Sequence, residues 1–219
     1  MIKILYEDNA ILVCVKPAGM PTQTAKITEK DMVSELNIHL KKQNPKAGQV
    51  YVIHRLDREV KGVLVFAKTK SAAASLSKQI QDKIINKHYM AYVDGLFDKI
   101  SNEYTLLENY LYKDSKESKA VVIENATAIA EDVKQAKLEY RIEELFKDEN
   151  RSLLEINLLT GRFHQIRAQL SNIGHPISND IKYGGTKYSK YRRNEIGLVA
   201  YKLEFEHPES KEQMSFEID

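Results

Sequence analysis

The stretch that decides the fold is residues 51–69, YVIHRLDREVKGVLVFAKT. Two apolar runs, residues 51–53 and 63–67, flank a charged segment, and their composition predicts two strands, the second covered on both faces. Gly62 is expected to let the backbone turn between them. Asp57 would then lie at a strand end, in the kind of loop on which a rigid sheet positions catalytic groups. A surface turn with ion pairs is the alternative interpretation.

Length and composition describe an ordinary globular protein. The 219 residues suffice for one large domain or two small ones, and 42% of them are apolar and 29% charged. No run of about 18 apolar residues predicts a transmembrane helix. Acidic residues in the opening MIKILYEDNAILV argue against a signal peptide. The single cysteine, Cys14, is expected to be a buried thiol in a reducing compartment. The net charge of +2 permits local basic patches that bind nucleic acid.

Apolar periodicity predicts the other elements, although residues 98–150 are less informative. One helix is expected to be capped by Thr28, with Asp31 at its third position, and a second by Ser71. The apolar face of a third helix would comprise Phe163, Ile166, Leu170 and Ile173. Strands are expected at residues 4–15, 87–93, 119–123, 136–144, 153–159, 196–206 and 213–218. Because few βαβ units can be drawn, we predict one continuous α+β domain with mainly antiparallel strands.

Arg167 lies on the third of these helices. At 100° per residue, it is about 80° from the centre of the apolar face, which places it at the boundary between core and solvent. An arginine there must find an anion or lose stability. The alternative is an arginine whose stem runs along the helix edge while its head group stays in water.

Asp57 is the carboxylate best suited to chemistry. Nearby arginines, and Arg167 from a distant helix, would keep it ionised, as a nucleophile or base requires and a general acid does not. No second carboxylate has a partnering role, and motifs for catalytic triads, phosphate loops and zinc sites are missing. The sequence HRLD resembles a kinase catalytic loop, but a leucine interrupts it and no DFG follows.

Four segments resemble, in order, the motifs of the RluA-type RNA pseudouridine synthases. They are ILYEDNAILVCVKPAGMP, HRLDREVKGVLVFAKT, KHYMAYVDG and LLTGRFHQIRAQLSNIGHPISND. Together they cover nearly the whole chain. The chain departs from the family pattern at Val60, Lys61, Phe163, Gln169 and Asn179. None of these departures removes the aspartate, the tyrosine or the arginine, so they bear on the choice of substrate more than on activity.

This resemblance implies a fold and a reaction. The fold would be a long, bent, mostly antiparallel mixed sheet flanked by helices, with the active site in a central cleft. The reaction would isomerise uridine to pseudouridine in structured ribosomal or transfer RNA, without metal or cofactor. Asp57 would act as nucleophile or base, Tyr89 would stack on the flipped base, and Arg167 would pair with Asp57. Substrate-binding roles are predicted for Lys16, His54, Arg55, Arg58, Arg162, His164 and Gln165.

The resemblance also predicts how the protein meets RNA. Because its motifs start at residue 4, we expect a single catalytic domain over residues 1–219, with no separate N-terminal RNA-binding domain. This domain is expected to be a monomer in the cytoplasm, with no membrane attachment. It would bind RNA through phosphate contacts, and Lys61 and Arg193 would be among the contacting residues. The basic stretch KYSKYRR, residues 187–193, would line a phosphate track or form a solvated loop.

Two alternatives stay open at this level. Without the family resemblance, Tyr89 would be interpreted as a core residue. The competing function is an RNA-binding or RNA-folding protein that keeps the fold but does not depend on the modification. The complete set of Asp57, Tyr89 and Arg167 favours the enzyme, because a protein that only binds RNA has no need of it.

Overall fold

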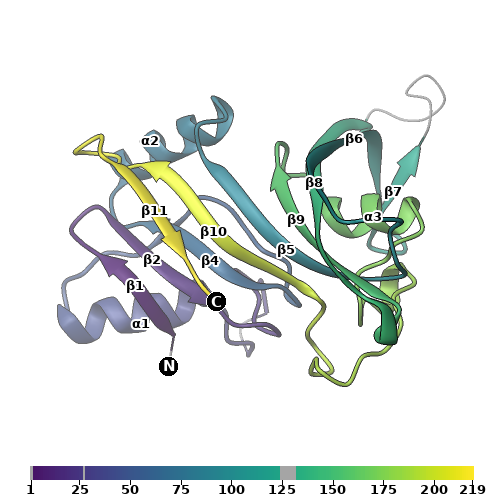
Figure 1. Ribbon diagram of the computed structural model, residues 1–219. Coiled ribbons are helices and arrows are strands. Elements are labelled where there is room, and N and C mark those ends of the chain that lie inside the picture. Colours follow the sequence, from purple (N-terminus) through teal and green to yellow (C-terminus); the bar gives the residue numbers. More distant parts are fainter. Residues whose placement is uncertain (1, 27, 124–131) are drawn as a thin grey trace. The chain divides into compact units, whose positions relative to one another are not determined.

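A computed structural model describes residues 2–26, 28–123 and 132–219 (Figure 1). The chain divides into two compact units. The first unit comprises Met1–Lys87 and Ala200–Asp219, and the second comprises His88–Val199. Each is described by itself below. That residues 1–219 act as one catalytic domain stays a prediction.

The first unit is built on the strand order β1-β2-β4-β10, with β3 paired to β4 and β11 paired to β10. The β1–β2, β2–β4, β3–β4 and β10–β11 pairings are antiparallel. Every residue of β2 is buried, and so is every residue of β4 after the first, which confirms the prediction of a strand covered on both faces. The strands are β1 Lys3–Glu7, β2 Ile11–Lys16, β3 Tyr51–Val52, β4 Lys61–Ala67, β10 Leu198–Glu206 and β11 Gln213–Glu217.

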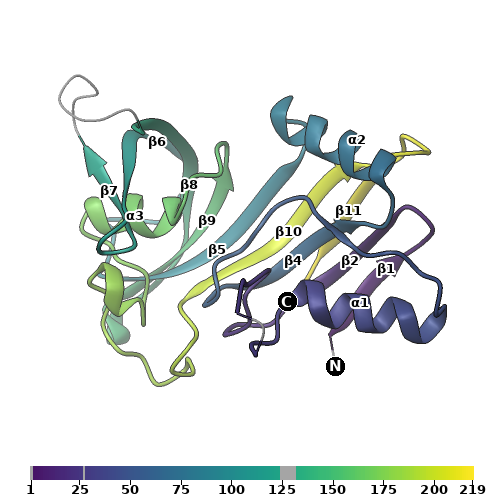
Figure 2. The same ribbon diagram turned by 180° about the vertical axis from the view of Figure 1, so that it is seen from behind.

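Helices α1 (Met32–Gln43) and α2 (Lys70–Gln81) cover the same face of this sheet, as the two opposite views show (Figures 1 and 2). Both predicted caps are wrong. Asp31 caps α1 through a capping box with Ser34, since its carboxylate accepts from the Ser34 N–H at 2.7 Å. Thr69 caps α2 by accepting from the Ala72 N–H at 3.1 Å.

Gly62 lies inside β4 and is not the turn residue that we predicted. A Cβ atom at this position would lie only 2.4 Å from the Cβ of Ala200 on β10. Glycine is therefore required for the close approach of two strands, and the turn itself is formed by Arg58 and Glu59.

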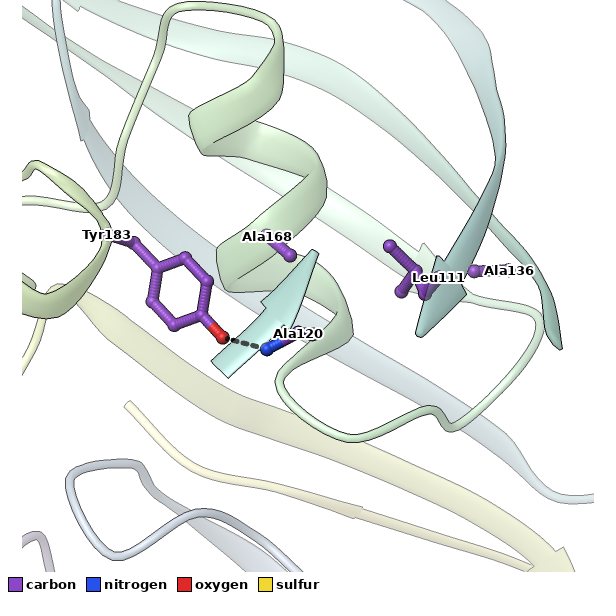
Figure 3. Close-up of a cluster of buried hydrophobic side chains, with 5 residues drawn as sticks. All are labelled: Leu111, Ala120, Ala136, Ala168 and Tyr183. Carbon is purple, nitrogen blue, oxygen red and sulfur yellow. Dashed lines mark hydrogen bonds between the residues drawn. The ribbon is translucent and has the colours of Figure 1, made fainter. Parts of the chain in front are cut away.

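The second unit has the strand order β5-β9-β8-β6-β7, and all four of its pairings are antiparallel. Helix α3 (Gln165–Asn172) packs against β7 and β6. A small core lies between them, formed by Leu111, Ala120, Ala136, Ala168 and Tyr183 (Figure 3). The strands are β5 Asn86–Asp94, β6 Ser101–Asp114, β7 Lys119–Ile123, β8 Lys134–Phe146 and β9 Arg151–Leu158, and the 3₁₀ turns are η1 Lys147–Glu149 and η2 Ile181–Tyr183.

The predicted α+β class with mainly antiparallel pairing is confirmed, while β6 is an element that sequence periodicity did not predict. Within the residues that the structure describes, no helix is long and apolar enough to cross a membrane.

Candidate active site

Asp57 lies in the loop between β3 and β4, and the peptide groups on both sides of it are anchored. The Thr22 hydroxyl donates to the Leu56 carbonyl at 3.0 Å and accepts from the Leu56 N–H at 3.2 Å. On the other side, the Arg58 carbonyl accepts from the Gly19 N–H at 2.7 Å. The half-buried Asp57 is thus carried by a loop whose backbone is fixed from the β2–α1 connection, as a catalytic group requires.

Lys16, the last residue of β2, reinforces this anchoring from inside the protein. Its side chain has no exposed surface, and its ammonium donates to the carbonyls of Pro17 (3.0 Å), Met20 (2.7 Å) and Arg58 (3.0 Å). Three carbonyls use all three ammonium protons. Substrate binding by Lys16 stays a prediction, and in this structure its charge is buried under the loop that carries Asp57.

Burial lowers the pKa of Lys16 to about 8, and the carboxylates of Asp57 and Glu59 act in the opposite direction. The unfolded chain therefore binds more protons than the native state between pH 8 and about 10.4, the pKa of an unperturbed lysine. The stability contributed by this group thus rises with pH across that window and is lost as the pH falls through 8.

We expect the free energy of unfolding of the wild type, minus that of Lys16→Met, to rise by at most about 3 kcal/mol between pH 8 and 10.5. Urea denaturation at a series of pH values measures this difference. Lys41→Met, at an exposed position on α1, is the control and should show no such rise. A flat difference for Lys16→Met would mean that the ammonium is hydrated in the native protein.

His54 holds the beginning of the same loop. Its Nε2 accepts from the Val65 N–H of β4 at 3.3 Å, just past the point where β3 stops pairing with β4. Its Nδ1 is buried without a hydrogen-bond partner among the described residues. Burial, with a smaller effect of the Lys87 charge, lowers the pKa of His54 to about 3, so the ring is neutral. Both ring nitrogens are thus turned away from solvent, which supports the loop, and the substrate contact of His54 stays a prediction.

The two arginines of the loop are exposed. The Arg58 guanidinium makes two hydrogen bonds to the Glu29 carboxylate, one of them 3.0 Å long. An exposed pair of this kind is worth about 0–1 kcal/mol, so a phosphate can replace Glu29 at little cost. Substrate binding by Arg55 and Arg58 stays a prediction, and the exposure of both residues is compatible with it.

Arg167 is the centre of a buried polar cluster in the second unit. Its Nε donates to Asp180 Oδ2 at 2.7 Å and its Nη2 to Asp180 Oδ1 at 2.9 Å, in a bidentate pair. The guanidinium also lies over the Tyr183 ring, 5.0 Å from its centroid. The turn η2 joins these two partners, and the Tyr183 hydroxyl accepts from the Ala120 N–H at 2.7 Å (Figure 3).

The predicted boundary position of Arg167 is wrong, because its side chain is only 3% exposed. Every residue of α3 from Gln165 to Leu170 is buried, and Phe163 lies before the helix with 40% of its surface exposed. The predicted need for an anion is met by Asp180, which we did not single out although it ends the fourth motif. The predicted pairing of Arg167 with Asp57 stays a prediction.

Gln165 is held by hydrogen bonds inside the second unit, and its role in substrate binding stays a prediction. Its side-chain oxygen accepts from the Thr160 hydroxyl and the Arg162 N–H, and its amide donates to the Lys137 carbonyl and to Gln169. Only 3% of Gln165 is exposed. Arg162, by contrast, is exposed, and its side-chain Nε donates to the Gln135 carbonyl.

Three other predicted residues keep their assignments as predictions. Tyr89 lies on β5 opposite Ile156 of β9 and is 5% exposed. His164 is half-buried, with its Nδ1 2.9 Å from the Tyr183 hydroxyl. In the basic stretch 187–193, Lys190 donates to Glu149 at 3.0 Å, whereas Arg193 is exposed.

Among the described residues, no group of three or more His, Cys, Asp or Glu is placed to hold a metal ion.

Comparison with known proteins decides the family. Residues 10–172, which include Asp57, Tyr89 and Arg167, match the family model described as RNA pseudouridylate synthase. The chain belongs to the RNA pseudouridylate synthase family. It is 31% identical over 215 residues to the ribosomal large subunit pseudouridine synthase C of Haemophilus ducreyi, covering 96% of this chain and 63% of that protein. It is 32% identical to an uncharacterized RNA pseudouridine synthase of Aquifex aeolicus, covering 100% of this chain and 69% of that protein.

Solved structures confirm that the chain has the fold of the pseudouridylate synthase family. The human RNA pseudouridylate synthase domain containing 4 superposes with a TM-score of 0.78 at 21% identity, covering 99% of this chain and 88% of that one. The structure of human RNA pseudouridylate synthase domain containing 1 gives a TM-score of 0.76 at 22% identity, covering 100% of this chain and 83% of that one. At such identities, the likeness concerns the fold alone.

Proposed function

We propose that this protein is an RNA pseudouridine synthase that isomerises specific uridines in ribosomal RNA. The observation that carries the proposal is the family match over residues 10–172, which spans the three residues assigned to chemistry. Ribosomal RNA is proposed first because the relatives of Haemophilus ducreyi and Haemophilus influenzae are named ribosomal large subunit pseudouridine synthase C. Transfer RNA is the second substrate class to be tested. We place the protein in the cytoplasm, with this RNA.

The chemistry that we assign to Asp57 follows from its environment. The buried Lys16 ammonium and the Asp57 carboxylate attract each other, and an opposite charge nearby favours the ionised form that a nucleophile or base needs. In the isomerisation, the bond from the ribose C1′ to N1 of uracil breaks, a bond from C1′ to C5 forms, and the C5 proton is lost while N1 gains one. Product and substrate are isomers, so the atoms and electrons balance without a co-reactant.

Arg167 and Tyr89 have supporting roles in the proposal. Arg167 would hold the Asp57 carboxylate, and Tyr89 would stack on the uracil after it leaves the RNA stack. A base can meet only the small exposed part of the Tyr89 ring, because 95% of the residue is covered. We therefore assign to Tyr89 the edge of the base pocket, in which part of the ring supports the protein core.

The test of the proposed function is the release of tritium from carbon 5 of labelled uridine. In vitro transcribed ribosomal and transfer RNAs would be incubated with the purified protein, and pseudouridine would be quantified in the same samples. We expect tritium release that equals the pseudouridine formed, on ribosomal RNA before transfer RNA. RNA binding without tritium release from either substrate would favour the alternative of an RNA-binding protein.

Tyr89→Phe is expected to keep RNA affinity but to slow turnover, because the ring remains and the hydroxyl is lost. Tyr89→Leu should also weaken capture of the base, since stacking on an aromatic ring is worth about 1–3 kcal/mol. Turnover under saturating RNA and filter binding separate the two effects. Equal turnover by the wild type and Tyr89→Leu would show that this tyrosine is a core residue only.

A further inference from the structure

Phe163 is an exposed aromatic side chain whose position is fixed by its neighbours. Its ring stacks on the His164 imidazole, with centroids 3.8 Å apart and planes 19° from parallel. The His164 ring is held edge-on to the buried Tyr183, and its Nδ1 is 2.9 Å from the Tyr183 hydroxyl. Phe163 nevertheless keeps 40% of its surface exposed. A large apolar ring is thus held rigidly at the surface of the second unit.

The backbone is also adapted to this arrangement. His164 has a φ of 49°, in the left-handed region, which is uncommon for a residue with a Cβ atom. This conformation brings the side chains of consecutive residues face to face. A sterically unfavourable conformation that presents an exposed ring points to a use for that ring.

One cation lies over the exposed ring, and another precedes it directly in the chain. The Lys113 ammonium of β6 lies 4.8 Å from the centroid of Phe163. Because His164 covers one face of the ring at stacking distance, the ammonium must lie over the other face. Lys113 and Arg162 are both exposed. An exposed aromatic ring with cations on it and next to it in the chain offers the stacking and phosphate contacts with which proteins bind single-stranded nucleic acid, whereas protein docking sites are usually broader apolar patches.

We propose that Phe163, stacked on His164, is a platform for one unpaired base of the RNA substrate, and that Lys113 and Arg162 bind the phosphates beside that base. This inference rests on the proposed function, because it concerns a second nucleotide of the same RNA, distinct from the target uridine. Phe163 is one of the positions at which the chain departs from the family pattern, so the platform would be a specificity determinant of this chain.

The free energies of the two contacts favour a stacked base over the Lys113 ammonium that now lies on the Phe163 ring. An exposed cation–π contact changes an equilibrium about 2- to 5-fold. Stacking of a base on an aromatic ring changes it roughly 5- to 150-fold. A base is therefore expected to displace the Lys113 ammonium, whose flexible side chain can then reach a neighbouring phosphate. Little ordering cost arises, because the His164 and Tyr183 contacts already fix the Phe163 ring.

The probe for the test is a single-stranded oligocytidylate of about 12 nucleotides, within the range of known site sizes, with one central 2-aminopurine whose pyrimidine neighbours stack on it only weakly. This base is fluorescent and is quenched when it stacks. Quenching is expected with the wild type, and Phe163→Ala should lose it and weaken affinity roughly 5- to 150-fold. Phe163→Trp should retain both. Leu106→Ala removes another exposed apolar side chain of the same strand as Lys113 and is the matched control, expected to bind as the wild type does.

Salt dependence separates stacking from phosphate contact. Phe163→Ala should leave the slope of log K against log salt unchanged, whereas Lys113→Ala should reduce it by about 0.7. The platform would be overturned by an unquenched probe with the wild type, by an unchanged affinity of Phe163→Ala, by failure of Phe163→Trp to retain binding, or by an equal loss in Leu106→Ala. If the true ligand of this ring were a partner protein, the affinity of Phe163→Ala for the probe would be unchanged.

Tritium release distinguishes this inference from the proposed function. A wild type that quenches the probe but releases no tritium from uridine-labelled RNA would keep the platform and overturn the synthase. A wild type that releases tritium while Phe163→Ala binds the probe normally would keep the synthase and overturn the platform.

Discussion

Replacement of Asp57 by asparagine is expected to reduce pseudouridine formation below detection, while RNA affinity stays the same or rises slightly. The amide can neither attack nor take a proton, and no other carboxylate is assigned that role. The loop should keep its shape, because Thr22 and Lys16 anchor the backbone on either side of residue 57. Removal of one negative charge from a site that meets phosphate accounts for the small gain in affinity.

Tritium release and filter binding on the same preparation measure the two effects of Asp57→Asn. Glu59→Gln is the matched control, since it neutralises the next carboxylate along the same turn and should leave turnover intact. If Asp57 were only a surface ion-pair partner, its loss would cost about 0–1 kcal/mol of stability and activity would persist. Turnover by Asp57→Asn within tenfold of the wild type would contradict the catalytic assignment.

Arg167→Met is expected to destabilise the protein by about 3–5 kcal/mol and to abolish activity, because it leaves the buried Asp180 carboxylate without its partner. Arg167→Lys keeps the charge but not the planar fork that makes two parallel bonds, so it should lose part of the stability and most of the activity. Urea denaturation measures the first effect and tritium release the second. A lysine variant as active as the wild type would contradict a positioning role for the guanidinium.

A double variant separates the structural role of Arg167 from its proposed catalytic one. In Arg167→Met with Asp180→Asn, no uncompensated charge remains, and we expect recovery of part of the lost stability through a coupling of about 0.5–3 kcal/mol. Activity should stay lost, because the arginine proposed to act on Asp57 is still missing. Recovery of activity together with stability would show that Arg167 only supports the fold.

The strands and the antiparallel pairing could be predicted where burial leaves a pattern in the sequence. β4 is buried on both faces, so its continuous apolar run was sufficient. β6 was missed although it is 14 residues long, because Leu111 is its only buried residue and no alternation results. Both helix caps were missed because two residues able to cap lie within one turn of each other. Hydrogen bonds such as that from the Thr24 N–H to Asp31 then decide which one is used.

The environment of the candidate site could not be predicted from local pattern, because it depends on contacts that are distant in sequence. A single apolar stripe placed Arg167 at the helix boundary, whereas strands and the turn η2 bury the helix on nearly every side. Lys16 looks like a surface cation until the carbonyl of Arg58, 42 residues away, is placed beside it. Asp180, at the end of the same motif as Arg167, was the signal of this burial in the sequence, because a buried arginine needs an acidic partner.

Nucleotide-resolution mapping of pseudouridine tests the central claim most directly. Ribosomal and transfer RNA would be compared among cells with the gene, cells without it, and cells complemented with the Asp57→Asn variant. The account predicts at least one ribosomal RNA position that is pseudouridine with the gene and uridine in the other two strains. An unchanged map in cells that lack the gene, or a map restored by Asp57→Asn, would contradict it.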